Sequence, residues 1–145
     1  MNFKIHCQCG RVVFDVTGQP IVHATCHCSD CRTLLGVPFH AVTAWNRDDI
    51  ILKEGQRFLS LFQHPTLNMQ KHFCVNCAQV LFNTNSMGWR VLAQPLIEAC
   101  LPEGLPEALS SDKHLFYDQR VVDINDELPK YLRGTSGPLY DATTS

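Results

Sequence analysis

The chain has 145 residues, of which 45% are hydrophobic and 18% are charged, with a formal net charge of −2. This length suits one domain with its own core, and the apolar content excludes an intrinsically disordered chain. The balanced charge gives no basic field of the kind that binds nucleic acid, and the apolar runs are too short to cross a bilayer. We therefore expect neither nucleic acid nor a membrane as a partner.

Short strand candidates separated by turn residues run along most of the chain. The first two form a hairpin over residues 5–16 with its turn at Gly10, and the others lie at 42–45, 50–52, 57–62, 67–73, 80–82, 90–93 and 115–117. Short helical segments are predicted at 29–35 and 126–132. The pattern predicts an all-β fold, a sandwich or tent-like arrangement of short antiparallel strands with few short helices. We expect one domain over residues 1–134 and a loose C-terminal tail over 135–145.

Eight cysteines are the unusual feature of the composition. Seven of them fall in three tight groups, and Cys100 stands alone; the groups are Cys7 and Cys9, then Cys26, Cys28 and Cys31, then Cys74 and Cys77. The first residues lack the basic and apolar segments of a signal peptide, so we expect a cytoplasmic protein. In that reducing compartment, clustered cysteines indicate metal or redox chemistry rather than structural disulfides.

The first and third groups together offer four thiolates, two at each of two hairpin turns. Four such ligands are typical of a structural zinc site, here Cys7, Cys9, Cys74 and Cys77, which would clamp the N-terminal hairpin to a distant segment. Gly10 follows the first pair and can adopt the positive φ of a tight turn. The equivalent residue after the second pair is Ala78, for which the same geometry costs about 1 kcal/mol. The alternative is a set of ordinary buried thiols.

The middle group offers three thiolates, Cys26, Cys28 and Cys31, and no obvious fourth ligand. Three protein ligands with an open position are typical of catalytic zinc. His27 is an alternative fourth ligand, and Cys100 is expected to be a packed thiol. Three thiolates on one Zn²⁺ leave a net charge of −1, which suits the ionisation of an incoming thiol better than the generation of hydroxide.

Two arginines stand next to these groups, Arg11 beside the first and Arg32 beside the second. Either can offset the negative charge of bound thiolates. The alternative for both is an ordinary solvated arginine at the surface.

These motifs resemble those of the glutathione-dependent formaldehyde-activating enzyme family, which also includes centromere protein V. The resemblance rests on Cys7-x-Cys9-Gly10, Cys26-His27-Cys28-x-x-Cys31-Arg32 and Phe73-Cys74-x-x-Cys77, and it extends to Asp126-Glu127-Leu128-Pro129-Lys130-Tyr131. It implies a β-rich fold with a structural zinc on the first four ligands and a catalytic zinc on the other three. It also implies a carbon–sulfur lyase that joins glutathione to formaldehyde, giving S-hydroxymethylglutathione. One departure is Ala78, where the family usually has glycine.

The mechanism that this resemblance implies begins with a substrate thiol taking the open position on the metal. The thiol loses its proton and attacks an electrophilic carbon. Candidate proton acceptors are His27, His40 and His72, although such histidines are more often structural. Candidate pocket-lining aromatics are Phe39, Trp45, Phe62 and Trp89, although aromatics in a β domain usually belong to the core.

Two other classes of function remain open at this point. One is a zinc-stapled interaction module without chemistry, and the other is a thiol redox protein that uses Cys74 and Cys77. The redox alternative lacks the βαβ context in which such a dithiol usually works. Metal content distinguishes the redox protein from the other two, and turnover of a thiol adduct distinguishes the enzyme from the module.

Overall fold

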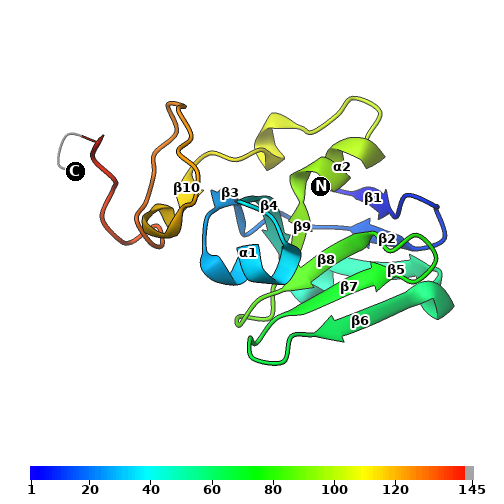
Figure 1. Ribbon diagram of the computed structural model, residues 1–145. Helices are drawn as coiled ribbons and strands as arrows, with labels where there is room; N and C mark the ends of the chain where they lie inside the picture. Colours follow the sequence, from blue (N-terminus) through cyan, green and yellow to red (C-terminus); the bar gives the residue numbers. More distant parts are fainter. Residues whose placement is uncertain (143–145) are drawn as a thin grey trace.

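The computed structural model describes residues 1–142, in which two β-sheets and two short α-helices form the regular structure (Figure 1). The strands are β1 (Phe3–His6), β2 (Val13–Val16), β3 (Val22–Cys26), β4 (His40–Trp45), β5 (Ile50–Glu54), β6 (Leu59–Gln63), β7 (Gln70–Cys74), β8 (Val80–Thr84), β9 (Arg90–Ala93) and β10 (His114–Leu115). The helices are α1 (Ser29–Leu35) and α2 (Gln94–Cys100). The predicted mostly β fold is confirmed.

The smaller sheet has the strand order β1-β2-β5, and the larger has the order β10-β3-β4-β9-β8-β7-β6. The pairs are antiparallel apart from β10 with β3, which run parallel. This one parallel pair brings a late segment of the chain beside the strand that ends at Cys26. It therefore links the C-terminal region directly to the second cysteine group.

The core lies where side chains of both sheets and α2 meet. Phe14 of β2 and Phe82 of β8 pack edge to face with ring centroids 5.2 Å apart, which joins the two sheets. Trp45 of β4 is fully buried and packs on Phe3 of β1 at 6.0 Å. The helix α2 lies beside β1 (Figure 1) and adds Ile97 to the same core.

The predicted helix at 29–35 is confirmed as α1, whereas the prediction of a helix over residues 126–132 is wrong. This segment instead pairs with β10, through a parallel bridge between His114 and Lys130. The N–H of His114 donates to the carbonyl oxygen of Pro129 at 2.8 Å, and that of Tyr131 donates to the carbonyl oxygen of His114 at 3.0 Å. The carbonyl oxygen of Pro129 and the N–H of Tyr131, which a helix would pair within itself, are thus hydrogen bonded to β10.

Part of the predicted C-terminal tail at 135–145 contacts the rest of the chain. Leu139 bridges to Tyr131, and the N–H of Tyr140 donates to the carbonyl oxygen of Lys130 at 2.7 Å. Residues 143–145 of that tail lie outside the described residues. Within residues 1–142, no helix is long and apolar enough to span a membrane.

Candidate metal centres and an adjoining cavity

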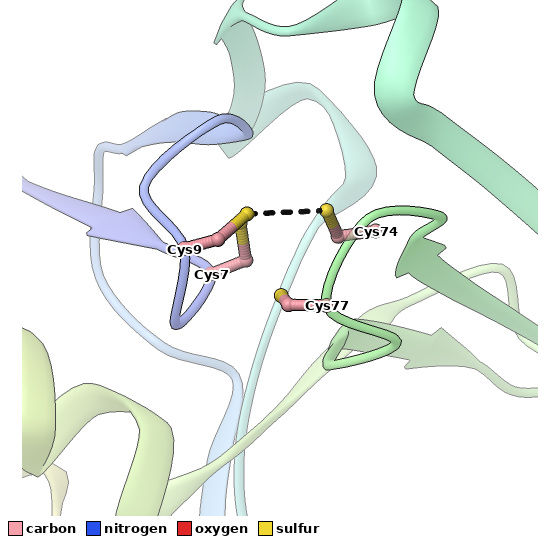
Figure 2. A group of neighbouring side chains, drawn as sticks. All are labelled: Cys7, Cys9, Cys74 and Cys77. Carbon is pink, nitrogen blue, oxygen red and sulfur yellow. Dashed lines mark hydrogen bonds between the residues drawn. The ribbon is translucent and has the colours of Figure 1, made fainter.

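The first cluster consists of Cys7, Cys9, Cys74 and Cys77, whose sulfur atoms all lie within 4.8 Å of one another (Figure 2). Two come from the turn after β1, and the other two from the end of β7 and the turn that follows it. The Cys9 sulfur lies 3.5 Å from that of Cys7 and 3.7 Å from that of Cys74. Sulfurs bound tetrahedrally at about 2.3 Å from one Zn²⁺ lie about 3.8 Å apart, so this donor set fits the ion.

The two turns that carry the first cluster both place a residue with positive φ directly after the second cysteine. Gly10 has a φ of 78° and Ala78 a φ of 66°, so the alanine adopts the left-handed conformation that the sequence predicted to be costly there. The N–H of Gly10 donates to the carbonyl oxygen of Cys7 at 2.9 Å, and that of Ala78 donates to Cys74 at 2.7 Å. Each turn therefore folds back on its first cysteine, over three residues in the first turn and four in the second.

Hydrogen bonds within the turns favour ionised thiols in the first cluster. A hydrogen bond from the Asn76 side chain, followed by one from the Arg11 backbone, lowers the pKa of Cys9 to about 6. The N–H of Val12 donates to the Cys7 sulfur at 3.4 Å. Burial raises the pKa of Cys74 to about 11. The cluster thus combines two thiols with a lowered pKa, Cys9 and Cys77, with the buried Cys7 and Cys74, a setting in which a divalent cation is favourable.

The second cluster consists of Cys26, Cys28 and Cys31, again with sulfurs within 4.8 Å of one another. Cys26 ends β3, Cys28 is the N-cap of α1, and Cys31 lies in the first turn of that helix. The N–H of Cys31 donates to the Cys28 sulfur at 3.3 Å, and the sulfurs of Cys31 and Cys26 are 3.8 Å apart. This spacing also fits ligands of one tetrahedral ion, with three positions filled by protein.

The three thiols of the second cluster share their protons unequally. Hydrogen bonds from Cys26 and Cys31 lower the pKa of Cys28 to about 3. Hydrogen bonding to Cys28 in turn raises the pKa of Cys26 to about 12, and its two cysteine neighbours raise the pKa of Cys31. Hydrogen bonding among the three sulfurs therefore favours a single thiolate over several.

No fourth protein ligand completes the second cluster among the residues that the structure describes. His27 is fully buried and its Nε2 lies 2.9 Å from Nδ1 of His114. Cys100 hydrogen bonds to the backbone of His6, where its sulfur lies 3.3 Å from the nitrogen and 3.4 Å from the oxygen. His27, the alternative ligand, thus stands apart from the three sulfurs, and Cys100 packs against the core as the sequence predicted.

A chain of side chains leads from His27 to the C-terminal region. Nε2 of His114 lies 2.8 Å from a carboxylate oxygen of Asp126, and the other oxygen accepts a hydrogen bond from Lys130 at 2.6 Å. Burial lowers the pKa of His27 to about 4, so this ring is neutral at physiological pH. Sequence reasoning did not find His114; the one relevant signal was the Asp126–Tyr131 motif.

The other two predicted proton acceptors have partners of their own. His40 is paired with Cys26 in the β3–β4 register, and its Nε2 lies 3.3 Å from Oδ1 of Asn83. His72 stacks on Phe82 with ring centroids 4.4 Å apart. Neither histidine lines the cavity that adjoins the second cluster.

A cavity of about 420 Å³ adjoins the second cluster, and Cys26, Cys28 and Cys31 all line it. Of the four candidate aromatics, Trp89 alone lines this cavity in the described part of the chain. The others lie elsewhere: Trp45 belongs to the core, Phe39 packs on His27 with ring centroids 5.8 Å apart, and Phe62 is exposed. The first cluster, by contrast, packs within the main core.

The two neighbouring arginines make contacts of their own. Arg11 stacks over the ring of Phe58 at 5.3 Å. Arg32 donates to the carbonyl oxygen of His27 at 3.3 Å and to that of Gln119 at 2.9 Å. Arg32 therefore fastens the backbone around the second cluster.

Comparison with known proteins gives one family and one fold. A family model described as glutathione-dependent formaldehyde-activating enzyme matches residues 2–119, a range that contains all seven clustered cysteines. A crystal structure of a Rhodobacter sphaeroides protein aligns with a TM-score of 0.51 at 23% identity, over 69% of this chain and 92% of that chain. At this identity the likeness shows the fold alone. A comparison with curated proteins found no match.

Proposed function

This chain belongs to the glutathione-dependent formaldehyde-activating enzyme family, and on that premise we propose that it is a carbon–sulfur lyase-type enzyme acting on thiol–aldehyde adducts. The reaction would make or break the bond between a thiol sulfur and a small aldehyde carbon, with glutathione and formaldehyde as the pair that the family suggests. One observation carries the proposal: the three sulfurs of the second cluster line a cavity of a size typical for small substrates.

We assign Cys7, Cys9, Cys74 and Cys77 to a structural Zn²⁺ and the other three clustered cysteines to a catalytic Zn²⁺. The donor sets support this division, because four thiols complete a tetrahedral site in the core whereas three leave room for a substrate beside a cavity. Zn²⁺ held by Cys26, Cys28 and Cys31 would supply a field that lowers the pKa of a substrate thiol.

The proposed chemistry is an addition and its reverse. The thiolate sulfur attacks the aldehyde carbon, the C–S bond forms, and the carbonyl π pair moves to the oxygen, which takes up a proton. Cleavage runs through the same steps backwards, and no oxidant or reductant is needed. The chain's own contribution is to hold both reactants in the cavity beside the cluster and to exclude bulk water from them.

We also infer a reducing, cytoplasmic location for this protein. All eight cysteines are free in the structure. Thiols that ligate a metal must stay reduced, and the cytoplasm is the compartment that keeps them so.

The proposal is tested by measuring the exchange between formaldehyde and a thiol at equilibrium with magnetisation-transfer NMR. We expect the zinc-loaded protein to accelerate this exchange, and Cys28→Ser to lower the acceleration by about a hundredfold or more. Cys100→Ser is the matched control, because it also removes one thiol but lies outside both clusters, and it should retain the activity. If fully zinc-loaded protein does not accelerate the exchange of formaldehyde with any thiol, the protein is not this enzyme, and the interaction module without chemistry is the better interpretation.

A further inference from the structure

The walls of the cavity beside the second cluster are largely apolar. Its volume of about 420 Å³ lies within the range of small-molecule sites. Strands β3, β4 and β9 contribute apolar side chains to it, namely Val22, Val42, Ala44 and Val91. The loops before β7 and before β9 add Leu67, Met69, Met87 and Trp89. A ligand seated here therefore exchanges water for hydrocarbon over much of its surface.

The polar side chains of the lining are mostly neutral, and two of them already make hydrogen bonds within the protein. Oδ1 of Asn83 lies 3.3 Å from Nε2 of His40. Oδ1 of Asn85 accepts hydrogen bonds from the N–H groups of Met87 and Trp89, each at 3.1 Å. These amides shape the cavity wall and hold the loop that carries Trp89.

The charge around the cavity is negative. Apart from the cysteines, Asp30 is the one ionisable side chain in the lining that residues 1–142 provide. None of the twelve lysines and arginines, all within that described range, lines the cavity. Arg32, the closest of them along the chain to the second cluster, donates to the carbonyl oxygens of His27 and Gln119. An anionic ligand would thus find no cationic side chain in the lining.

We infer that the thiol handled at this site is an uncharged one with an apolar body, rather than glutathione. This assignment rests on the proposed function, which supplies the reaction. At neutral pH glutathione carries two carboxylates and one ammonium group. Asp30 can pair with the ammonium, but the lining offers the two carboxylates only uncharged polar side chains, such as Thr66, Asn68 and Ser86, and no cation. A carboxylate desolvated there has no ionic partner, which is unfavourable. An aryl or alkyl thiol instead buries its body against Val91 and Trp89.

The decisive comparison uses zinc-loaded protein and three thiols: phenylmethanethiol, glutathione and glutathione diethyl ester. The ester keeps the peptide and its thiol but removes both carboxylates. Binding is followed by quenching of Trp89 fluorescence, with Trp89→Phe giving the background from buried Trp45. We expect phenylmethanethiol to bind at least roughly tenfold tighter than glutathione, with the ester in between. Exchange with formaldehyde, measured by NMR on the same samples, should follow the same order.

A charge placed at the cavity should change this preference. Met87 lines the cavity and is 63% exposed, so a lysine there can reach solvent and a bound carboxylate alike. Met87→Lys should raise the affinity for glutathione relative to that for phenylmethanethiol by about fivefold, as expected for one partly exposed ion pair. Leu61→Lys is the matched control on strand β6, because Leu61 is 51% exposed and lies outside the lining, and it should change neither affinity.

The possible outcomes separate this inference from the function on which it rests. Glutathione that binds and exchanges as well as phenylmethanethiol overturns the inference and leaves the proposed function standing. If phenylmethanethiol binds tightly but no thiol exchanges with formaldehyde, the preference of the cavity for apolar thiols is supported and the proposed enzymatic function is wrong. If no thiol quenches Trp89 and none exchanges, both are wrong.

Discussion

His27 and His114 lie 87 residues apart in the sequence, yet Nε2 of the first is 2.9 Å from Nδ1 of the second. Their rings stand on neighbouring segments, because β10 pairs with β3 and the N–H of His27 donates to the carbonyl oxygen of Leu115 at 3.0 Å. Since His27 lies between two cysteines of the second cluster, this contact fixes the backbone that presents them. The C-terminal region is thus part of the support of the site.

Replacing the carboxylate of Asp126, which contacts His114 on the side away from His27, should weaken the fold. We expect Asp126→Asn to lower the free energy of unfolding at pH 7 by about 1.5 kcal/mol, because it removes charged hydrogen bonds with His114 and Lys130. Urea unfolding measures the effect. Asp123→Asn is the control, since that side chain is 82% exposed and pairs with Arg120 at the surface.

The same variant should also change the pH dependence of stability. Burial acts to raise the pKa of Asp126, but hydrogen bonds from Lys130 and His114 outweigh it and hold the pKa at about 2. The folded value is therefore below the usual one, so this stabilisation is complete above about pH 4 and is lost as the pH falls through about 2. The difference in the free energy of unfolding between the parent protein and Asp126→Asn should therefore shrink as the pH falls over that interval. An equal difference at pH 7 and pH 2 would contradict the assignment.

The two clusters should respond differently to the loss of one thiol. Cys74→Ser removes a ligand from the core, and we expect the melting temperature to fall by roughly 10 °C or more because structural zinc contributes folding energy. Cys28→Ser should change the melting temperature by only a few degrees while emptying the second cluster. Thermal unfolding with metal analysis of both variants measures this, and equal destabilisation would mean that the division into structural and catalytic sites is wrong.

A chelator should remove metal in two stages. Purified protein is expected to carry between about one and two zinc ions, because the site with three protein ligands holds its ion less tightly than the site with four. The first stage should leave the circular dichroism spectrum unchanged, and the second should unfold the chain. Metal analysis along the time course measures the order. A metal-free protein that keeps its melting temperature would contradict the structural site.

The left-handed alanine offers a stabilising substitution. Ala78 has a φ of 66°, so Ala78→Gly should raise the free energy of unfolding by about 0.5–1 kcal/mol. Gly10→Ala is the reciprocal test in the equivalent turn. A Cβ at Gly10 meets no atom within 4 Å, so its cost of about 1 kcal/mol would come from the backbone alone. Urea unfolding in excess zinc measures both, and opposite signs are expected.

The cysteine spacing predicted both clusters because each pair of ligands is fixed locally, at a turn such as that of Gly10 or at the start of α1. The helix α2 was missed, although Pro95 in its first turn is favourable there, because its apolar side chains do not stand out from a strand pattern. The segment 126–132 was misassigned because its partner is β10, a non-local pairing that no periodicity records. The contact of His27 with His114 could not be predicted from the sequence, because it also depends on the non-local pairing of β10.

The first cluster also divides the chain into an enclosed and an outer part. Cys9 and Cys74 are 65 residues apart, and β2 to β6 lie between them. Linking ends across a loop of this length removes conformations from the unfolded chain that are worth about 4 kcal/mol at 25 °C. While a metal is held there, the enclosed strands stay tethered even when their hydrogen bonds open. The edge strand β10, which begins at His114, has no such tether. It can therefore peel away and return, and its amide hydrogens should exchange with solvent before those of β2 and β5.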